Sequence, residues 1–344
     1  MVAFLGVGDL CRLVGEIGIE NFIVALADRI EQDFRRWEEF EKTPRYACHS
    51  PVGVIELMPA SDGHRFGFKS VNGHPANTAK GLQTVAAFGV LADVDTGYPL
   101  LLSEMTILTA LRTAATSAVA ARNLARDDSR TMALIGLGAQ SEFQAVAFRT
   151  LLGIERVRIW DIDTAAVEKF RANMGLSGLD VVVTASAEEA VGGADIITTI
   201  TADKVQASIL SANMVGAGVH INAVGGDCPG KTELVPAILD RASVFVEHPE
   251  QTRIEGEIQQ MSNDYPVTEI WRVIAGDASG RTSPDEVTIF DSVGFAIEDF
   301  SALCLVYEML LERADPRRLD LIPAPKNPRD LFGLLQPLQR WEPA

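Results

Sequence analysis

Residues 131–141 read Thr-Met-Ala-Leu-Ile-Gly-Leu-Gly-Ala-Gln-Ser, and this stretch constrains the fold more than any other. A short apolar run ends in a turn containing Gly136 and Gly138, and an amphipathic segment follows at once. This order of strand, tight turn and helix is typical of the βαβ unit that binds dinucleotides. Gly136 permits the turn, and Gly138, which has no Cβ, lets the backbone approach a pyrophosphate at the start of the helix. The third glycine of the usual pattern is replaced by Ser141, so the motif needs support from its surroundings.

A carboxylate further along the chain gives that support. The strand-like run over residues 156–161 ends in Asp161, 25 residues after Gly136. An acidic residue at about this distance accepts hydrogen bonds from ribose hydroxyls and would repel a 2′-phosphate. We therefore predict that the cofactor is NAD rather than NADP. The alternative is an ordinary aspartate that ends a strand or caps a helix.

The rest of the chain predicts two kinds of structure. After Asp161, apolar strand-like runs alternate with helical segments, which favours a mostly parallel sheet covered on both faces. Those strands are expected at 181–183, 196–200, 219–224, 244–246 and 287–290, and the helices at 164–174, 187–192, 234–242 and 294–313. Before the dinucleotide motif, a helix is expected over 20–40, strands at 52–58, 65–71, 86–92 and 100–102, and a helix over 106–125. The fold class is thus α/β, a doubly wound Rossmann-type domain joined to an α+β domain.

Composition excludes some partners. The formal charge of −17 argues against nucleic acid or an anionic membrane surface as a partner. The four cysteines form no CxxC pair and no zinc-ligand spacing, and the apolar N-terminal stretch has no basic leader. We expect a cytoplasmic protein without a metal site.

Three cations stand in apolar settings before the dinucleotide motif, namely Arg45, Lys69 and Arg112. Charges in such places are costly unless they are paired. One interpretation is a set of structural salt bridges to Glu56 or Glu104. The other is a clamp for a substrate carboxylate, which guanidinium groups bind in bidentate geometry. The sequence alone leaves both open.

Two polar segments follow predicted strands on the C-terminal side of the dinucleotide motif. Asp227 comes just after a Gly-Gly pair in residues 222–231, at the position where doubly wound sheets bind their ligands. It is either a general acid and base, an anchor for an amine, or a turn-forming aspartate. Ser292 and Val293 follow the last strand in the same way and either reach the nicotinamide side or merely turn the chain.

With these pieces in place, the chain resembles the ornithine cyclodeaminase/μ-crystallin family over nearly its whole length. The segments that carry the resemblance are residues 54–59, 69–78, 111–116, 136–140, 222–231 and 253–260. Long segments in the same order are far more specific than the glycine pattern.

The resemblance implies a redox-neutral reaction in which L-ornithine becomes L-proline and ammonia with bound NAD used and regenerated. It places Arg45, Lys69 and Arg112 on the substrate carboxylate and Val293 beside the substrate. It makes Asp227 the catalytic acid and base, and we add Glu56 as a second carboxylate. The cofactor residues that it implies are Thr84, Arg112, Gly136, Gly138, Ala139, Gln140, Asp161, Thr201, Asn222, Ala223, Val224, Gly225, Lys231 and Ser292.

The resemblance also implies a homodimer built through the first domain. We expect a substrate-binding and dimerisation domain over residues 1–115, completed by the tail 317–344, and an NAD-binding domain over 116–316. Within the family, lysine cyclodeaminases, ketimine reductases, alanine dehydrogenases and non-catalytic NAD(P)H binders like the crystallins are the alternatives.

Overall fold

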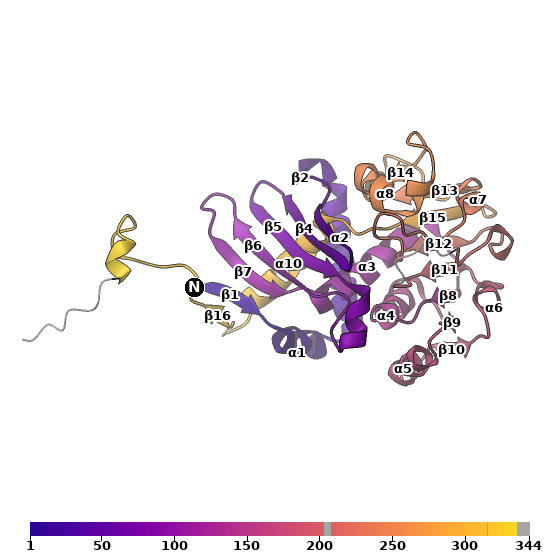
Figure 1. Ribbon diagram of the computed structural model, residues 1–344, viewed down its shortest axis with the longest axis horizontal. Helices are drawn as coiled ribbons and strands as arrows, with labels where there is room; N and C mark the ends of the chain where they lie inside the picture. The colour runs from indigo at the N-terminus through magenta and orange to yellow at the C-terminus, as the bar shows by residue number, and fades with distance from the viewer. Residues whose placement is uncertain (203–207, 315, 336–344) are drawn as a thin grey trace, which may run out of the picture.

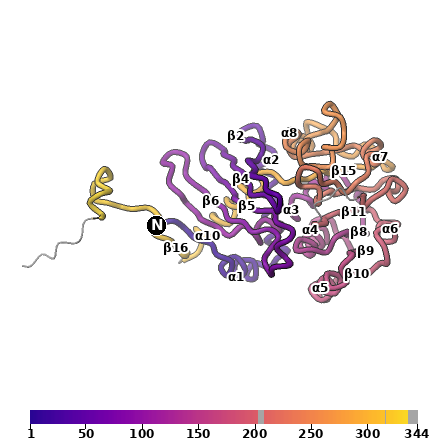
Figure 2. Tube along the Cα trace, in the orientation of Figure 1, coloured from indigo at the N-terminus to yellow at the C-terminus, as the bar shows by residue number. Residues whose placement is uncertain are grey.

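The structure is a computed structural model that describes residues 1–202, 208–314 and 316–335. Within these residues, two eight-stranded sheets lie side by side, as Figure 1 shows. The chain passes from the first sheet to the second through α3 (Thr106–Leu124) and returns along the first sheet through α10 (Ala296–Leu311) (Figure 2).

The first sheet is antiparallel except where β1 lies parallel to β7. Its order is β16 (Arg318–Leu319), β1 (Val2–Leu5), β7 (Pro99–Glu104), β6 (Ala87–Asp93), β5 (Arg65–Gly73), β4 (Gly53–Ser61) and β2 (Glu41–Lys42), with β3 (Tyr46–Ser50) also paired to β4. Because side chains alternate across a strand, each strand presents one set inward and one outward. Glu56 and Lys69 are on the inward set, and their neighbours across the strand pair are Val71 and Met58.

Among the described residues, helices cover only the inward face of this sheet. α10 packs on β4, β5, β6 and β7, and α2 (Ile19–Arg35) and α3 pack beside it. The side of α2 that faces them is fully buried at Phe22, Leu26 and Ile30. α1 (Val7–Ile17) precedes α2, and the 3₁₀ turns η1 (Trp37–Glu39) and η2 (Pro75–Lys80) lie in the connections. The outward face therefore stays uncovered in one chain.

The second sheet is entirely parallel. Its order is β10 (Asp180–Val183), β9 (Arg156–Trp160), β8 (Thr131–Ile135), β11 (Ile196–Thr199), β12 (His220–Ala223), β15 (Val287–Asp291), β13 (Ala242–Val246) and β14 (Thr268–Glu269). The chain leaves β8 in one direction and resumes at β11 on the other side, so these neighbours form the switch point where doubly wound sheets bind ligands.

Both faces of the second sheet are covered. Met132 and Leu134 of β8 pack in one core with Phe148 of α4 (Ser141–Leu152), while Ala133 and Ile135 pack in another with α6 (Ala187–Val191). The remaining helices are α5 (Thr164–Met174), α7 (Pro236–Leu239), α8 (Pro249–Glu255) and α9 (Ile270–Ala275), with the 3₁₀ turns η3 (Ala212–Met214) and η4 (Glu257–Gln260). The predicted α/β class with a doubly wound domain is confirmed.

Several predicted extents differ from the structure. The helix expected over 234–242 is shortened to α7, which begins at Pro236 because proline suits the first turn of a helix but not its interior. The boundary expected between residues 115 and 116 falls inside α3, and α10, from the expected NAD-binding domain, packs on the first sheet. The division into two domains stays a prediction.

The C-terminal tail contacts the body at β1, where Arg317 lies over the ring of Phe4 and 3.9 Å from Asp9. β16 pairs with β1, after which the chain runs away from the molecule and carries η5 (Phe332–Leu335) at a distance (Figure 1). Residues 336–344 of the predicted tail lie outside the described residues.

Candidate functional site

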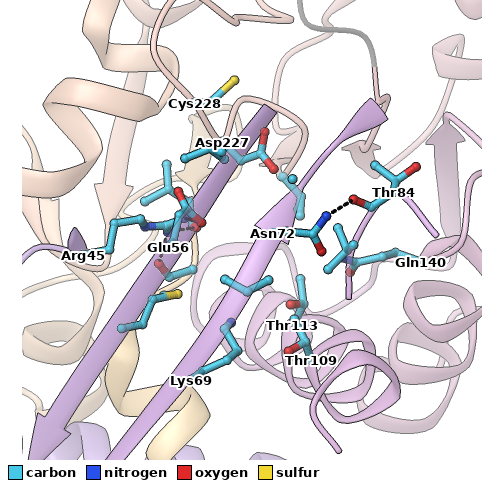
Figure 3. A pocket seen from close by; sticks show the side chains of 18 of the residues that line it. Arg45, Glu56, Lys69, Asn72, Thr84, Thr109, Thr113, Gln140, Asp227 and Cys228 are labelled. Carbon is cyan, nitrogen blue, oxygen red and sulfur yellow. Dashed lines mark hydrogen bonds and ion pairs between the residues drawn. The ribbon is translucent and has the colours of Figure 1, made fainter. Parts of the chain in front are cut away.

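A pocket lies where the inward face of the first sheet meets the carboxyl ends of the second. It takes residues from β4, β5, α3 and the loops after β8, β11, β12 and β15. The polar side chains that line it are Arg45, Glu56, Lys69, Asn72, Thr84, Thr109, Arg112, Thr113, Gln140, Asp227, Cys228, Lys231 and Ser292. Figure 3 shows Glu56 and Lys69 on two strands of the first sheet and Asp227 on a loop above them. The pocket therefore combines the predicted cations with the predicted acid.

The glycine turn after β8 has the geometry that a dinucleotide requires. Gly136 has a φ of 95°, and a Cβ there would lie 2.8 Å from the carbonyl oxygen of Ile200. At Gly138 a Cβ would meet nothing within 4 Å, so the space beside that backbone is open. Ser141, in the third motif position, is buried and donates a hydrogen bond to the carbonyl of Gly138. Serine thus closes the turn where glycine is usual.

Asp161 stands beside this turn, at the end of β9. One carboxylate oxygen accepts from the backbone N–H of Leu137 at 2.6 Å, and the other accepts from Asp163 at 2.8 Å. Both bonds hold the loop, so the structural alternative for this aspartate is realised. An ionised carboxylate keeps further lone pairs for ribose hydroxyls, because each oxygen has about two acceptor sites.

A buried carboxylate explains the first glycine of the Gly225-Gly226 pair. A Cβ on Gly225 would lie 2.2 Å from both carboxylate oxygens of Glu233. Glu233 is 1% exposed and accepts hydrogen bonds from the backbone N–H and the hydroxyl of Thr201. Burial raises the pKa of Glu233. This carboxylate therefore joins the loops after β11 and β12 at the edge where the dinucleotide is predicted.

Two more carboxylates extend the same pattern. Glu257 accepts from the backbone N–H groups of Glu233 and Leu234, and Asp291 accepts from those of Glu257 and Ile258. Burial raises the pKa of Asp291 to about 7. Each acid fixes the segment that holds the next one, so η4 and the loops beside the pocket form one bonded unit.

The loop after β15 is fixed in a similar way by Glu247. Its carboxylate accepts from the hydroxyl of Ser292 at 2.6 Å and from the N–H of Gly294 at 3.1 Å. Gly294 has a φ of 73°, and a Cβ there would lie 2.7 Å from the Arg112 guanidinium. Only glycine tolerates both the positive φ and the close approach of Arg112 at this position. The turn at Gly294 thereby keeps Ser292 and Val293 at the pocket wall.

Substituting Gly225 with alanine is expected to displace Glu233 and release Thr201. Forcing a methyl into this occupied space should cost about 1–3 kcal/mol of unfolding free energy. Thermal unfolding of the apo protein, with NAD affinity from titration, measures both effects. Gly138→Ala is the matched control: its methyl meets open space, so apo stability should stay unchanged while NAD binding weakens. Equal apo stability of the two variants would contradict this account.

Arg45 lies between β2 and β3 and reaches into the pocket with a side chain only 7% exposed. One Nη donates to Glu56 at 3.1 Å, and the other donates to the carbonyls of Val293 and Gly294. Its Nε lies 3.2 Å from Glu255 of α8. Burial opposes the charge, but Glu56 and Glu255 outweigh it and hold the pKa of Arg45 above its ordinary value.

Lys69 and Arg112 share a buried aspartate of α10. Lys69 Nζ and Arg112 Nε donate to the same oxygen of Asp299, at 2.9 and 2.8 Å, and Lys69 Nζ also lies 2.8 Å from the other oxygen. Arg112 also contacts Glu298. Burial, with Arg112 nearby, lowers the pKa of Lys69 to about 8. Helix α10 thus supplies the counter-charges that keep two cations inside a closely packed wall.

These contacts are compatible with both interpretations of the cations. All three line one pocket, as a carboxylate clamp requires, and all three are also salt-bridged. Glu56 is a partner, as expected, but Glu104 is not. Its carboxylate accepts from the backbone N–H of Ile107 at the start of α3, and it pairs with no cation among the described residues.

Asp227 enters the pocket from the loop after β12, across from Glu56 (Figure 3). Its side chain is 56% exposed, and one oxygen lies 3.4 Å from Lys231 Nζ. Lys231 also donates to the carbonyl of Thr201 at 2.9 Å. The aspartate is therefore held at the pocket mouth by a lysine from the predicted cofactor side. It is not enclosed among apolar groups.

The structure separates the predicted site residues into two groups. Those on the pocket wall are Arg45, Glu56, Lys69, Thr84, Arg112, Gln140, Val224, Asp227, Lys231, Ser292 and Val293. The others stand behind it or along the sheet edge: Gly136, Gly138, Ala139, Asp161, Thr201, Asn222, Ala223 and Gly225. The amide of Asn222 is fully buried between Thr198 and His220, so its side chain serves the sheet. The roles of these residues stay predictions.

The buried acids that pair with groups of the site were not predicted from the sequence. They are Glu233, Glu247, Glu255, Glu257, Asp291, Glu298 and Asp299. A signal was present, because several follow an apolar strand directly or stand next to a glycine. Acidic residues at such positions are also typical of ordinary turns and helix starts, so the signal did not single them out. No group of metal-ligating side chains occurs among the described residues, and none of their helices is long and apolar enough to cross a membrane.

Comparison with known proteins agrees with the fold. The family model described as "Ornithine cyclodeaminase/mu-crystallin family" matches residues 8–314. A protein named ornithine cyclodeaminase from Agrobacterium fabrum is 62% identical, covering 97% of this chain and 95% of its own. A solved structure described as the basis for recognition of L-lysine, L-ornithine and L-2,4-diaminobutyric acid by lysine cyclodeaminase has a TM-score of 0.90 at 35% identity, covering 97% of this chain and 99% of its own. An archaeal alanine dehydrogenase dimer with bound NAD has a TM-score of 0.85 at 32% identity, covering 93% and 99%. The chain belongs to the ornithine cyclodeaminase/mu-crystallin family.

Proposed function

We propose that this protein is an NAD-dependent ornithine cyclodeaminase, an ammonia-lyase that converts L-ornithine to L-proline and ammonia. The observation that carries the proposal is the pocket in which Arg45, Lys69 and Arg112 face Asp227 beside the glycine turn after β8. The identity of 62% to a protein of that name, over nearly the whole of both chains, supports ornithine as the substrate.

The residues at the sheet edge suit NAD. Open space beside Gly138 admits a pyrophosphate, and Gln140, at the start of α4, has a buried side-chain oxygen without a hydrogen-bond partner in the described structure. Asp161 suits a ribose without a 2′-phosphate. Thr201 and Lys231 are fixed nearby by Glu233 and Asp227. Bound beside these residues, NAD would supply a reversible hydride acceptor for the substrate Cα.

The protein's own groups orient the substrate and handle its protons. Arg45, Lys69 and Arg112 would bind the α-carboxylate and fix the Cα against the cofactor. The side-chain amine attacks only after it loses its proton, so it needs a nearby carboxylate. Asp227 and Glu56 stand at suitable positions on the pocket wall. Asp227, which is partly exposed, would also exchange protons with solvent and protonate the departing ammonia.

A substrate panel tests this proposal. The purified protein is mixed with catalytic NAD⁺ and with L-ornithine, L-lysine or L-alanine, and ammonia, cyclic amino acid and NADH are followed. The proposal predicts proline and ammonia in equal amounts from ornithine, with no accumulation of NADH. Steady NADH production without proline would favour a dehydrogenase, and NAD binding without turnover would favour a non-catalytic binder.

We also propose that the chain forms a homodimer through the outward face of the first sheet. That face carries exposed apolar side chains at Ile55 (56%), Phe66 (40%) and Phe88 (50%), where a solvated sheet would be polar. In the part of the chain that the structure describes, helices cover only the opposite face. Sedimentation equilibrium should give twice the chain mass of 37.2 kDa, and a monomer at micromolar concentration would contradict the proposal.

The reaction would place the protein in proline formation from ornithine, and hence in the breakdown of arginine and ornithine. We propose that this takes place in the cytoplasm. Fractionation of the native cells, with proline and ammonia formation assayed in each fraction, tests the location, and activity confined to the membrane or exported fraction would contradict it.

A further inference from the structure

The Arg45 guanidinium has no free edge for a substrate carboxylate. One Nη donates to Glu56 and the other to two backbone carbonyls, while Nε faces Glu255 at 3.2 Å. A carboxylate binds a guanidinium best through two parallel hydrogen bonds along one edge. One of the existing partners must therefore leave Arg45 when a substrate carboxylate arrives.

The carboxylates that pair with the three cations differ in their access to the pocket. They are Glu56, Glu255, Glu298 and Asp299. In the described part of the chain, Glu56 alone among these four lines the pocket wall. Glu298 and Asp299 are at most 1% exposed and are held on α10 behind Arg112 and Lys69. Glu56 is therefore the partner that a substrate can displace.

A displaced Glu56 needs a new partner. It is 7% exposed, and a buried carboxylate that has lost its cation is strongly unfavourable. An amino acid with a second ammonium on its side chain supplies both halves of the exchange. Its carboxylate takes the place of Glu56 on Arg45, and its ammonium becomes the new partner of Glu56.

Resting on the proposed function, we propose that the Arg45–Glu56 pair is a substrate-exchanged ion pair that selects amino acids with a side-chain ammonium. Ornithine replaces one internal pair by two new ones. An amino acid with an uncharged side chain breaks the pair and leaves Glu56 alone. The pocket thus disfavours monoamino acids in two ways. They lack an ammonium that could contact Glu56, and their binding leaves the Glu56 carboxylate buried without a cation.

Glu255 makes the exchange possible without moving Arg45. Its carboxylate stays beside Nε, and the two backbone carbonyls stay on one Nη, so the guanidinium remains fixed while only the other Nη changes partner. The facing atoms, Arg45 Nε and Glu255 Oε2, lack an aligned hydrogen bond although both are buried. Burial raises the pKa of Glu255 to about 7, so this residue also limits the total negative charge around Arg45.

Ligand binding to the Glu56→Gln variant tests the proposal. The enzyme is saturated with NADH, so no hydride is removed from Cα, and L-ornithine or L-norvaline is titrated by calorimetry. Norvaline has the same carbon chain without the ammonium. Because a hydrogen bond to a charged group contributes a factor of about 10 to 100 in affinity, ornithine should bind at least tenfold more weakly to the variant. Norvaline should bind more tightly to the variant than to the wild type.

The control is Glu255→Gln, which removes the other carboxylate on Arg45 but leaves the exchanged one. It should change the affinities for both ligands in the same direction. Equal weakening of both ligands by Glu56→Gln would overturn the proposal, because Glu56 would then be only structural. An opposite response of the two ligands to Glu255→Gln would overturn the choice of Glu56 as the displaced partner.

A second variant and the result for the wild type complete the test. If circular dichroism shows that Glu56→Gln does not fold, Glu56→Met removes the charge with a side chain of similar length. The affinity for ornithine should again fall while the affinity for norvaline rises. Failure of the wild type to bind ornithine would instead contradict the proposed function. If the wild type binds ornithine but the two affinities do not change in opposite directions in the variant, only the proposed exchange is contradicted.

Discussion

Replacing Asp227 with asparagine is expected to lower kcat for proline formation by about 100- to 10,000-fold, the usual contribution of a positioned acid or base. The amide has nearly the same shape but cannot take up a proton from the amine or give one to the departing ammonia. NAD should still bind, because Lys231 keeps its bond to the carbonyl of Thr201. Steady-state kinetics and NAD titration measure the two effects separately.

The control for this variant is Asp95→Asn, on the exposed hairpin between β6 and β7. It makes the same chemical change far from the pocket and should keep the parent rate. If Asp227→Asn turned over ornithine at the parent rate, its role as acid and base would be wrong. If the variant lost NAD binding as well, Asp227 would act through the cofactor site.

Replacing Asp299 with asparagine is expected to lower the free energy of unfolding by about 3–5 kcal/mol, as for other broken buried ion pairs. Asp299 is 1% exposed and contacts both Lys69 and Arg112. Among the described residues it is the only ion-pair partner of Lys69. Without it, the buried ammonium must either remain unpaired or lose its proton. Urea unfolding followed by circular dichroism gives the difference.

An exposed pair provides the comparison for Asp299→Asn. Arg156 and Asp180 form an ion pair at 2.6 Å with both side chains more than half exposed. Pairs of this kind contribute about 0–1 kcal/mol, so Asp180→Asn should change the unfolding midpoint little. Similar midpoints for the two variants would mean that water reaches the Lys69 site, contrary to its burial in the structure.

The sequence predicted those parts of the fold that depend on local pattern. The glycine turn at Gly136 and Gly138 and the alternating apolar strands predicted a doubly wound sheet because each strand must bury both faces. The long helix over 106–125 was recognisable because its run of apolar and small residues is also a local pattern. Short elements such as β2, β14 and α9 were not predicted, since two to six residues carry too little periodicity.

The site was predictable to the extent that its residues stand out locally. Arg45, Lys69 and Arg112 are cations in apolar surroundings, and Asp227 follows a strand and two glycines, so all four were singled out and all four line the pocket. Their partners were not predictable. Glu298 and Asp299 lie 186 and 187 residues beyond Arg112, and only the packing of α10 on the first sheet brings them together. Contacts over such separations leave no spacing signal.

The most direct measurement of the central claim follows the hydrogen at the substrate Cα. L-Ornithine deuterated at Cα is converted by the protein with catalytic, unlabelled NAD⁺, and the proline is analysed by mass spectrometry and NMR. If Arg45, Lys69 and Arg112 hold the substrate against bound NAD while Asp227 moves the protons, proline should keep the deuterium at Cα. Proline that carries ordinary hydrogen at Cα, or deuterium that accumulates in free NADH, would contradict the account.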